Sequence, residues 1–323
     1  LAFGWLPALV WVILGSVFIG GVHDYLCLIA SIRHKARSVA ELAKEFISPL
    51  SYRLFLLFIW LSLVYVLVVF ADLTAATFTM DGAVTTSSLL YIVLALAFGV
   101  SVYRFKYSVR NASLVIVPLV FAGIWLGQEL PLRAEYLPWH FLGDAKNTWL
   151  VVLIVYCFIA STTPVWILLQ PRDYLSSYLL YVAVLVGFIG IVFGSHPVQY
   201  PAFQVWHAAA LGPLVPLLFI TVACGACSGF HSLVASGTTS KQLNKETDAR
   251  FIGYGGMLLE GVVAVIAIAS VAMLGAGDPL TREQPLAVYA SGMGAFAGVV
   301  GVPQHIGYSF GLLALSTFIL TTL

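Results

Sequence analysis

One short segment gathers most of the side chains that could do chemistry in an otherwise apolar chain. Residues 223–239 hold three glycines, two cysteines, three serines, two threonines and a histidine. At helical spacing Cys224, Cys227, Ser228 and His231 share one face, because residues three and four apart stack on each other. Buried polar groups need partners, so this face must meet other helices or a wet cavity rather than lipid. We expect Ser228 and His231 to contact a solute there.

The spacing of Cys224, Cys227 and His231 is also that of metal ligands on a helix. A zinc site needs about four such ligands, and one helix seldom supplies more than two with suitable geometry. The remaining cysteines, Cys27 and Cys157, lie in separate apolar runs and form no second pair. Small residues that allow close helix packing are the favoured interpretation. We therefore expect no metal and no cofactor.

Glu260 is the most informative ionisable residue because of its depth in an apolar run. It lies nine positions after residue 251, where we expect its span to begin, or about 14 Å into a hydrocarbon core of about 30 Å. A carboxyl group at that depth must pair, face the interior or carry a proton, and intramembrane carboxyls often couple ions. The alternative is a structural carboxyl bonded between helices. Gly255, Gly256 and Gly261 flank it and would let a neighbouring helix approach.

Two further acid or base residues, His23 and Asp24, lie in the last third of the first apolar run. We include both as candidates for ion coupling. The run is longer than the bilayer core requires, so both residues could equally lie among the cytoplasmic headgroups. The sequence leaves these two interpretations open.

Gly237, Thr238 and Thr239 close the polar segment. Glycine followed by hydroxyls suits a helix that unwinds where freed backbone groups meet an ion or a solute, and we include Thr238 and Thr239 as solute-binding candidates. An ordinary helix end before a cytoplasmic loop is the alternative. The glycine content predicts that the helix departs from regular geometry, or packs unusually closely, between Gly225 and Gly229 or at Gly237.

The composition of the whole chain predicts which type of secondary structure positions these residues. The 323-residue chain is 61% hydrophobic and 9% charged, against about 25% charged residues in soluble domains. Long apolar runs of about 20 residues predict an all-α polytopic membrane protein, a helical bundle. A shorter apolar run, 286–301, predicts a re-entrant or interfacial segment. The nine expected spans are residues 5–31, 54–79, 84–103, 112–130, 148–169, 177–195, 211–236, 251–275 and 306–323.

The distribution of basic residues predicts the orientation of these spans. Twelve of the fifteen Lys and Arg residues fall in or beside odd-numbered loops, and three fall in even-numbered loops. The positive-inside rule therefore places the odd loops in the cytoplasm. The first of them predicts a short amphipathic helix from Val39 to Phe46. We expect 1–323 to be a single transmembrane domain and, since both ends look cut, a fragment of a longer chain.

Six stretches of the chain together match a known pattern. They are residues 20–25 (GGVHDY), 32–38 (IRHKARS), 166–175 (WILLQPRDYL), 223–231 (ACGACSGFH), 236–239 (SGTT) and 248–260 (DARFIGYGGMLLE). The chain resembles the carbon starvation protein A family over residues 1–323. That family contains bacterial and archaeal inner-membrane transporters associated with peptide uptake during carbon starvation, and some with proton-coupled pyruvate uptake. Its grouping with the amino acid–polyamine–organocation superfamily implies a five-plus-five inverted repeat with broken helices.

The expectation is therefore a multi-pass inner-membrane transporter, not an enzyme. It would import a peptide or pyruvate by secondary active transport, coupled to a proton rather than to sodium, in the carbon-starvation stress response. Its expected partners are the solute, the ion and membrane lipid, with no nucleic acid. Cys227 departs from the family pattern, in which an aliphatic residue is common, and this weighs further against a metal. A solute channel and a metal-binding membrane enzyme are the alternatives.

Overall fold

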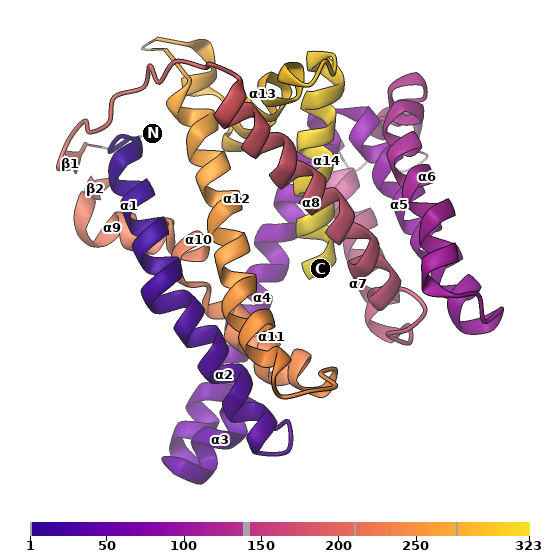
Figure 1. The fold of residues 1–323 in the computed structure, drawn as a ribbon, viewed down its shortest axis with the longest axis vertical. Coiled ribbons are helices and arrows are strands. Elements are labelled where there is room, and N and C mark those ends of the chain that lie inside the picture. Colours follow the sequence, from indigo (N-terminus) through magenta and orange to yellow (C-terminus); the bar gives the residue numbers. More distant parts are fainter. Residues whose placement is uncertain (1, 138–142, 210, 276) are drawn as a thin grey trace. The chain divides into compact units, whose positions relative to one another are not determined.

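The computed structural model describes residues 2–137, 143–209, 211–275 and 277–323, and its ribbon is built almost entirely of helices (Figure 1). Among these residues, eight helices are long and apolar enough to cross a membrane. This confirms the predicted all-helical membrane class. The eight helices are Trp5–Arg33, Pro49–Met80, Gly82–Arg104, Val109–Glu129, Ala145–Thr162, Leu169–Phe193, Arg250–Ala272 and Gln304–Thr322.

Several of these helices contain a π-helical turn, and short elements connect them. The helical elements are α1 (Trp5–Gly15), η1 (Ser16–Gly20), α2 (Gly21–Arg33), α3 (Val39–Phe46), α4 (Pro49–Met80), α5 (Gly82–Gly99), η2 (Val100–Arg104), α6 (Val109–Glu129), η3 (Ala134–Tyr136), α7 (Ala145–Thr162), α8 (Leu169–Phe193), α9 (Leu214–Thr221), α10 (Ala223–Cys227), α11 (Gly229–Gly237), η5 (Thr239–Lys241), η6 (Arg250–Tyr254), α12 (Gly255–Ala272), η7 (Pro279–Arg282), α13 (Pro285–Val299) and α14 (Gln304–Thr322). Strands β1 (His207–Ala208) and β2 (Gly212–Pro213), of two residues each, pair antiparallel.

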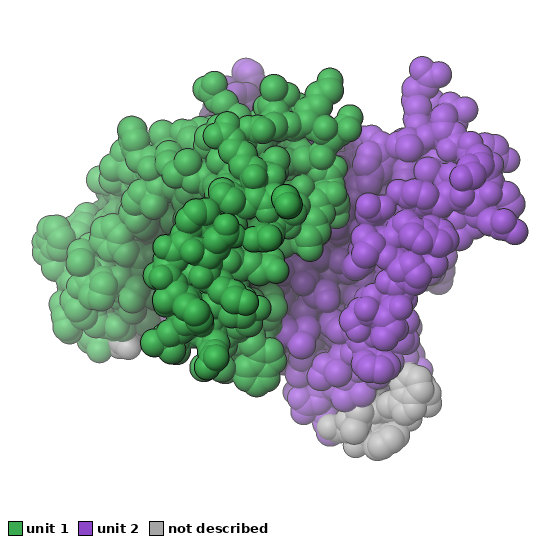
Figure 2. All heavy atoms as spheres, turned by 90° about the horizontal axis from the view of Figure 1, so that it is seen from below, with its two compact units in different colours: residues 1–64, 197–281 green, residues 65–196, 282–323 purple. Residues whose placement is uncertain are grey.

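The chain divides into two compact units, which Figure 2 shows in separate colours. Unit 1 contains residues 1–64 and 197–281, and unit 2 contains residues 65–196 and 282–323. Each unit is therefore assembled from two segments that are far apart in the sequence. The single transmembrane domain and the five-plus-five inverted repeat stay predictions.

The seventh expected span, 211–236, is not one continuous helix, and the count of nine spans stays a prediction. Val222 (φ −106°, ψ 17°) and Ser228 (φ −70°, ψ 109°) leave helical geometry and separate α9, α10 and α11. Glycines at 225 and 229 lower the helix propensity on both sides of Ser228, and serine competes for local backbone bonds. The irregularity expected between Gly225 and Gly229 is confirmed.

Helix α13 is the short apolar segment of the sequence pattern, and it lies buried in unit 2. Its 15 residues span about 22 Å, less than the bilayer core of about 30 Å. It packs closely on α14, since a Cβ atom at Gly307 or Gly311 would lie 2.8 Å from the Cβ of Ala297 or Met293. Its re-entrant or interfacial placement stays a prediction.

Two features of the loops that are predicted to be cytoplasmic can be compared with the structure. Helix α3 runs from Val39 to Phe46 as predicted, and Ser38 and Glu41 close its first turn with a capping box. Arg172, counted among the loop residues, instead lies in the first turn of α8 and is 1% exposed. Its Nη1 donates to the Tyr156 hydroxyl at 2.7 Å, so the charge is held by polar groups inside unit 2.

The predicted orientation can be tested at two exposed loop positions. In a variant without native cysteines, we expect an impermeant maleimide to label Tyr136→Cys in intact cells, because the loop after α6 is predicted to be outside. Gln242→Cys, in a predicted cytoplasmic loop, should react only after permeabilisation. Tyr136 is 67% exposed and Gln242 is also exposed, so either site is reachable from its own side. The opposite labelling pattern would reject this orientation.

Candidate functional site

Close packing at small residues brings the site-bearing helices of unit 1 together. A Cβ atom at Gly15 would lie 2.6 Å from the Cβ of Ala226, and one at Gly20 would lie 2.6 Å from the carbonyl oxygen of Ala226. A Cβ at Gly261 would lie 3.0 Å from the hydroxyl of Ser16. The first membrane helix therefore contacts α10 and α12 almost backbone to backbone, as small residues allow in membrane bundles.

His231 on α11 lies between two carboxylates that other helices contribute. Its Nδ1 is 2.8 Å from Oδ2 of Asp24 on α2, and its Nε2 is 2.7 Å from Oε2 of Glu260 on α12. Within the described residues Oε2 has no hydrogen bond of ordinary geometry, so we describe the Glu260 contact as an ion pair. We call Asp24, His231 and Glu260 the acid–histidine cluster.

The two contacts of the His231 ring restrict where protons can lie in the acid–histidine cluster. A neutral imidazole carries one N–H, whereas two ionised carboxylates facing the two ring nitrogens require two. Either His231 is an imidazolium, or one carboxyl group carries the proton in its place. The side chains of Asp24, Glu260 and His231 are 3%, 16% and 32% exposed, so the histidine is the most exposed member of the cluster.

Three neighbouring side chains complete the surroundings of the cluster. His23 Nδ1 lies 3.1 Å from Oδ1 of Asp24, and the Cys224 thiol donates to Oε1 of Glu260 at 3.1 Å. Cys224 also lies 3.7 Å from the Ser228 hydroxyl. The contact with Glu260 was missed in the sequence, where Cys224 looked like a packing residue or a metal ligand. Across the described ranges no three His, Cys, Asp or Glu side chains form a metal-binding group.

Ser228 directly precedes the start of α11. Ser228 is 4% exposed and has extended backbone geometry, and α11 begins at the next residue. The first N–H groups of a helix lack partners within it, and they favour an anion such as a carboxylate. Among the described atoms, none lies within 4 Å of a Cβ placed at Gly229, so there is open space beside this helix start.

The structure does not bring Thr238 and Thr239 to the cluster. Thr238 follows the last residue of α11 and is exposed, and Thr239 begins the 3₁₀ turn η5. Thr238 is seven residues beyond His231, which is about 10 Å along a helix axis. An ordinary helix end, one of the two interpretations open in the sequence, is the description that fits.

Two glycines of α10 and α11 offer a matched test of the packing. A Cβ at Gly225 would lie 2.7 Å from the Cβ of Ala264, whereas a Cβ at Gly229 meets open space. We expect Gly225→Ala to reduce the free energy of unfolding by about 1–3 kcal/mol, because the core is overpacked. Gly229→Ala should be neutral or slightly stabilising. Equal thermal stability of the two purified variants would contradict this packing.

Comparison with known proteins adds evidence of a different kind. A family model described as "Carbon starvation protein CstA" matches residues 1–279. The peptide transporter CstA of Escherichia coli K12 is 37% identical over 322 residues, which cover 95% of this chain and 44% of that protein. The pyruvate/proton symporter BtsT of the same organism is 35% identical over 289 residues, covering 87% of this chain and 40% of the relative.

A third relative comes from another organism and also aligns with most of this chain. The peptide transporter CstA of Mycobacterium tuberculosis H37Rv is 32% identical over 336 residues, covering 99% of this chain and 44% of that protein. The chain thus spans less than half the length of these relatives. No solved structure matches.

Proposed function

Because the chain belongs to the carbon starvation protein CstA family, we propose that it is part of a secondary active transporter in the bacterial inner membrane. The transporter imports a small carboxylate solute, a peptide or pyruvate, together with protons. The named relatives include peptide transporters and a pyruvate/proton symporter, and none of those cited is named as an enzyme. A peptide and pyruvate both carry a carboxylate, so one site chemistry serves either solute.

The proposal rests on the geometry of the acid–histidine cluster. With Glu260 ionised, His231 is held between two carboxylates at 2.8 and 2.7 Å. A proton on Glu260 removes one of these charges and frees the Nε2–H of His231. That N–H then donates to the carboxylate of a solute beside Ser228, where the start of α11 also favours an anion.

Release follows the same steps in reverse. When the proton leaves Glu260, the carboxylate pairs again with His231 and competes with the solute for the same N–H. Asp24 orients the ring through Nδ1, and His23 supports Asp24 from the other side. Proton and solute therefore bind together and leave together, which is the condition for symport.

Uptake into proteoliposomes tests the proposal. The purified protein should accumulate labelled dialanine or pyruvate against its gradient when the outside is made acidic, and accumulation should collapse when a protonophore is added. Saturation with increasing solute separates a carrier from a channel, the alternative left open by the sequence. Uptake that never exceeds equilibration under any imposed pH gradient would rule out proton-coupled transport.

A further inference from the structure

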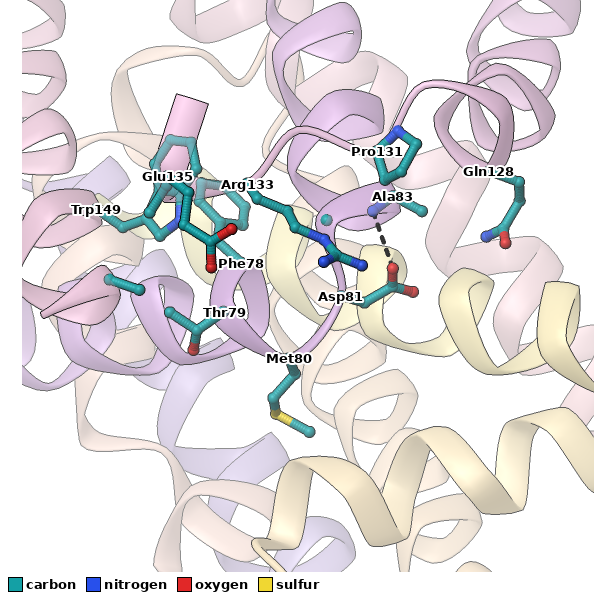
Figure 3. Close-up of a pocket in the computed structure, with 13 residues that line it drawn as sticks. Phe78, Thr79, Met80, Asp81, Ala83, Gln128, Pro131, Arg133, Glu135 and Trp149 are labelled. Atoms are coloured by element: carbon teal, nitrogen blue, oxygen red, sulfur yellow. Dashed lines mark hydrogen bonds between the residues drawn. The ribbon is translucent and has the colours of Figure 1, made fainter. Parts of the chain in front are cut away.

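Unit 2 contains a cavity of about 420 Å³, whereas the acid–histidine cluster belongs to unit 1. The cavity lies where α4 meets α5 and where the chain leaves α6, and Figure 3 shows the side chains that line it. Small-molecule sites have volumes of about 300–1,000 Å³, so the cavity is large enough for a metabolite. The predicted orientation places these loops on the outer side of the membrane.

Charged groups of both signs line this cavity without neutralising one another. Arg133 and Glu135 form no ion pair with any residue in the described part of the chain. Asp81 accepts a hydrogen bond from the Ala83 N–H at 2.9 Å, drawn dashed in Figure 3, and another from the Ser309 hydroxyl. Figure 3 shows the Arg133 guanidinium on the side of Asp81 and the Glu135 carboxylate on the side of Phe78 and Trp149.

The backbone that carries Arg133 is fastened to the start of α5. The Leu132 N–H lies 3.1 Å from the Gly82 carbonyl oxygen and 2.9 Å from the Thr86 hydroxyl oxygen. The Thr86 hydroxyl donates in turn to the carbonyl of Leu130 at 2.6 Å. These bonds hold the loop on both sides of Leu132, so the position of the Arg133 backbone is fixed before any ligand arrives.

Two buried donors in the cavity wall have no partner in the described part of the chain. The side-chain N–H groups of Gln128 and Trp149 both belong to residues that line the cavity, and neither finds an acceptor among the described residues. Trp149 is 2% exposed, and its ring packs edge to face on Phe78 with centroids 5.4 Å apart. Buried donors without acceptors are costly, and these two nitrogens lie in the packed wall of the cavity rather than on its open surface.

We propose that this cavity is a second solute site that binds a small zwitterion, a free amino acid or a short peptide. Arg133 binds the carboxylate, for which its planar guanidinium is well matched. Glu135 accepts from the amino group, with Asp81 adding negative charge. A monoanion such as pyruvate leaves Glu135 without a partner and binds more weakly. The site goes beyond the proposed function and does not rest on proton coupling at the cluster.

Calorimetry with chemically blocked ligands tests each half of this site. Purified protein is titrated with dialanine, with N-acetyl-dialanine, which lacks the amino charge, and with dialanine amide, which lacks the carboxylate. We expect the wild type to bind dialanine about tenfold more tightly than either blocked form, since one charge-assisted contact is lost in each. Pyruvate should compete poorly with dialanine for this cavity.

Two variants assign the contacts to residues. Arg133→Gln should weaken dialanine about tenfold and leave dialanine amide unchanged, while Glu135→Gln should weaken dialanine and leave N-acetyl-dialanine unchanged. Arg282→Gln is the matched control, because Arg282 is exposed in unit 2 and does not line the cavity. Wild-type affinity for dialanine in both Arg133→Gln and Glu135→Gln would overturn the proposal, as would equal binding of all three ligands to the wild type.

Uptake measurements separate this site from the proton-coupled one. Arg133→Gln should raise the dialanine concentration that gives half-maximal uptake, yet reach the wild-type accumulation ratio at saturation. A variant of the cluster should show the opposite behaviour, with the selectivity for zwitterions retained and accumulation lost. Failure of proton-driven uptake in the wild type would therefore leave the binding result standing, and failure of the binding result would leave symport standing.

Discussion

Glu260→Gln is expected to abolish proton-driven accumulation while leaving solute exchange across the membrane intact. Glutamine keeps the size of the side chain and can still accept from the Cys224 thiol, which donates to Oε1 at 3.1 Å in the structure. It cannot take up a proton, and it no longer pairs as an anion with His231. In proteoliposomes the variant should catalyse counterflow of labelled solute at rates near wild type, with an accumulation ratio close to one under an imposed pH gradient.

A surface carboxylate provides the control for this experiment. Glu246 pairs with Arg33 at 2.8 Å, and both side chains are well exposed, so Glu246→Gln should leave transport unchanged. Uphill transport by Glu260→Gln at the wild-type rate, with the same pH dependence, would remove Glu260 from the coupling role and leave it a structural carboxyl. Loss of counterflow together with accumulation would point instead to a damaged solute site.

Most of the helical fold could be predicted from hydropathy, for a physical reason. An apolar segment in lipid must satisfy its backbone internally, so a run of about 20 such residues has helix as its only option. For the seventh apolar run, residues 211–236, hydropathy alone does not predict where the helix is interrupted. Its start is as apolar as the others, but whether Val222 and Ser228 stay helical depends on what surrounds them, for example on how closely Gly225 meets Ala264.

Only part of the candidate site could be predicted from the sequence. Glu260 and His231 could be selected because polar groups at those depths need partners. Their connection to Asp24 could not, since Asp24 and His231 are 207 positions apart and no periodicity links one helix to another. Depth alone left Asp24 divided between a headgroup location and a site, and the contact of its 3% exposed side chain with His231 depends on tertiary packing that depth does not reveal.

The interaction between Asp24 and His231 can be measured as a coupling free energy. His231→Leu leaves the buried Asp24 carboxyl group without its imidazole partner, and removal of one member of a buried pair costs about 3–5 kcal/mol. Asp24→Asn removes the charge but keeps a polar side chain, so it should cost less, about 1–3 kcal/mol. The double variant should lose less stability than the sum of the two, with a coupling energy of about 1–3 kcal/mol.

Unfolding by SDS in mixed micelles gives the four free energies of this cycle. The matched cycle pairs Asp24→Asn with Cys224→Ala, because Cys224 contacts Glu260 rather than Asp24 and should show little coupling. If the losses from Asp24→Asn and His231→Leu simply add, the two side chains do not interact in the folded protein, and His231 is then not held from the Nδ1 side. In that case Glu260 could draw the imidazole away from the solute without opposition, and the exchange of one N–H between carboxylate and solute would no longer couple proton to substrate.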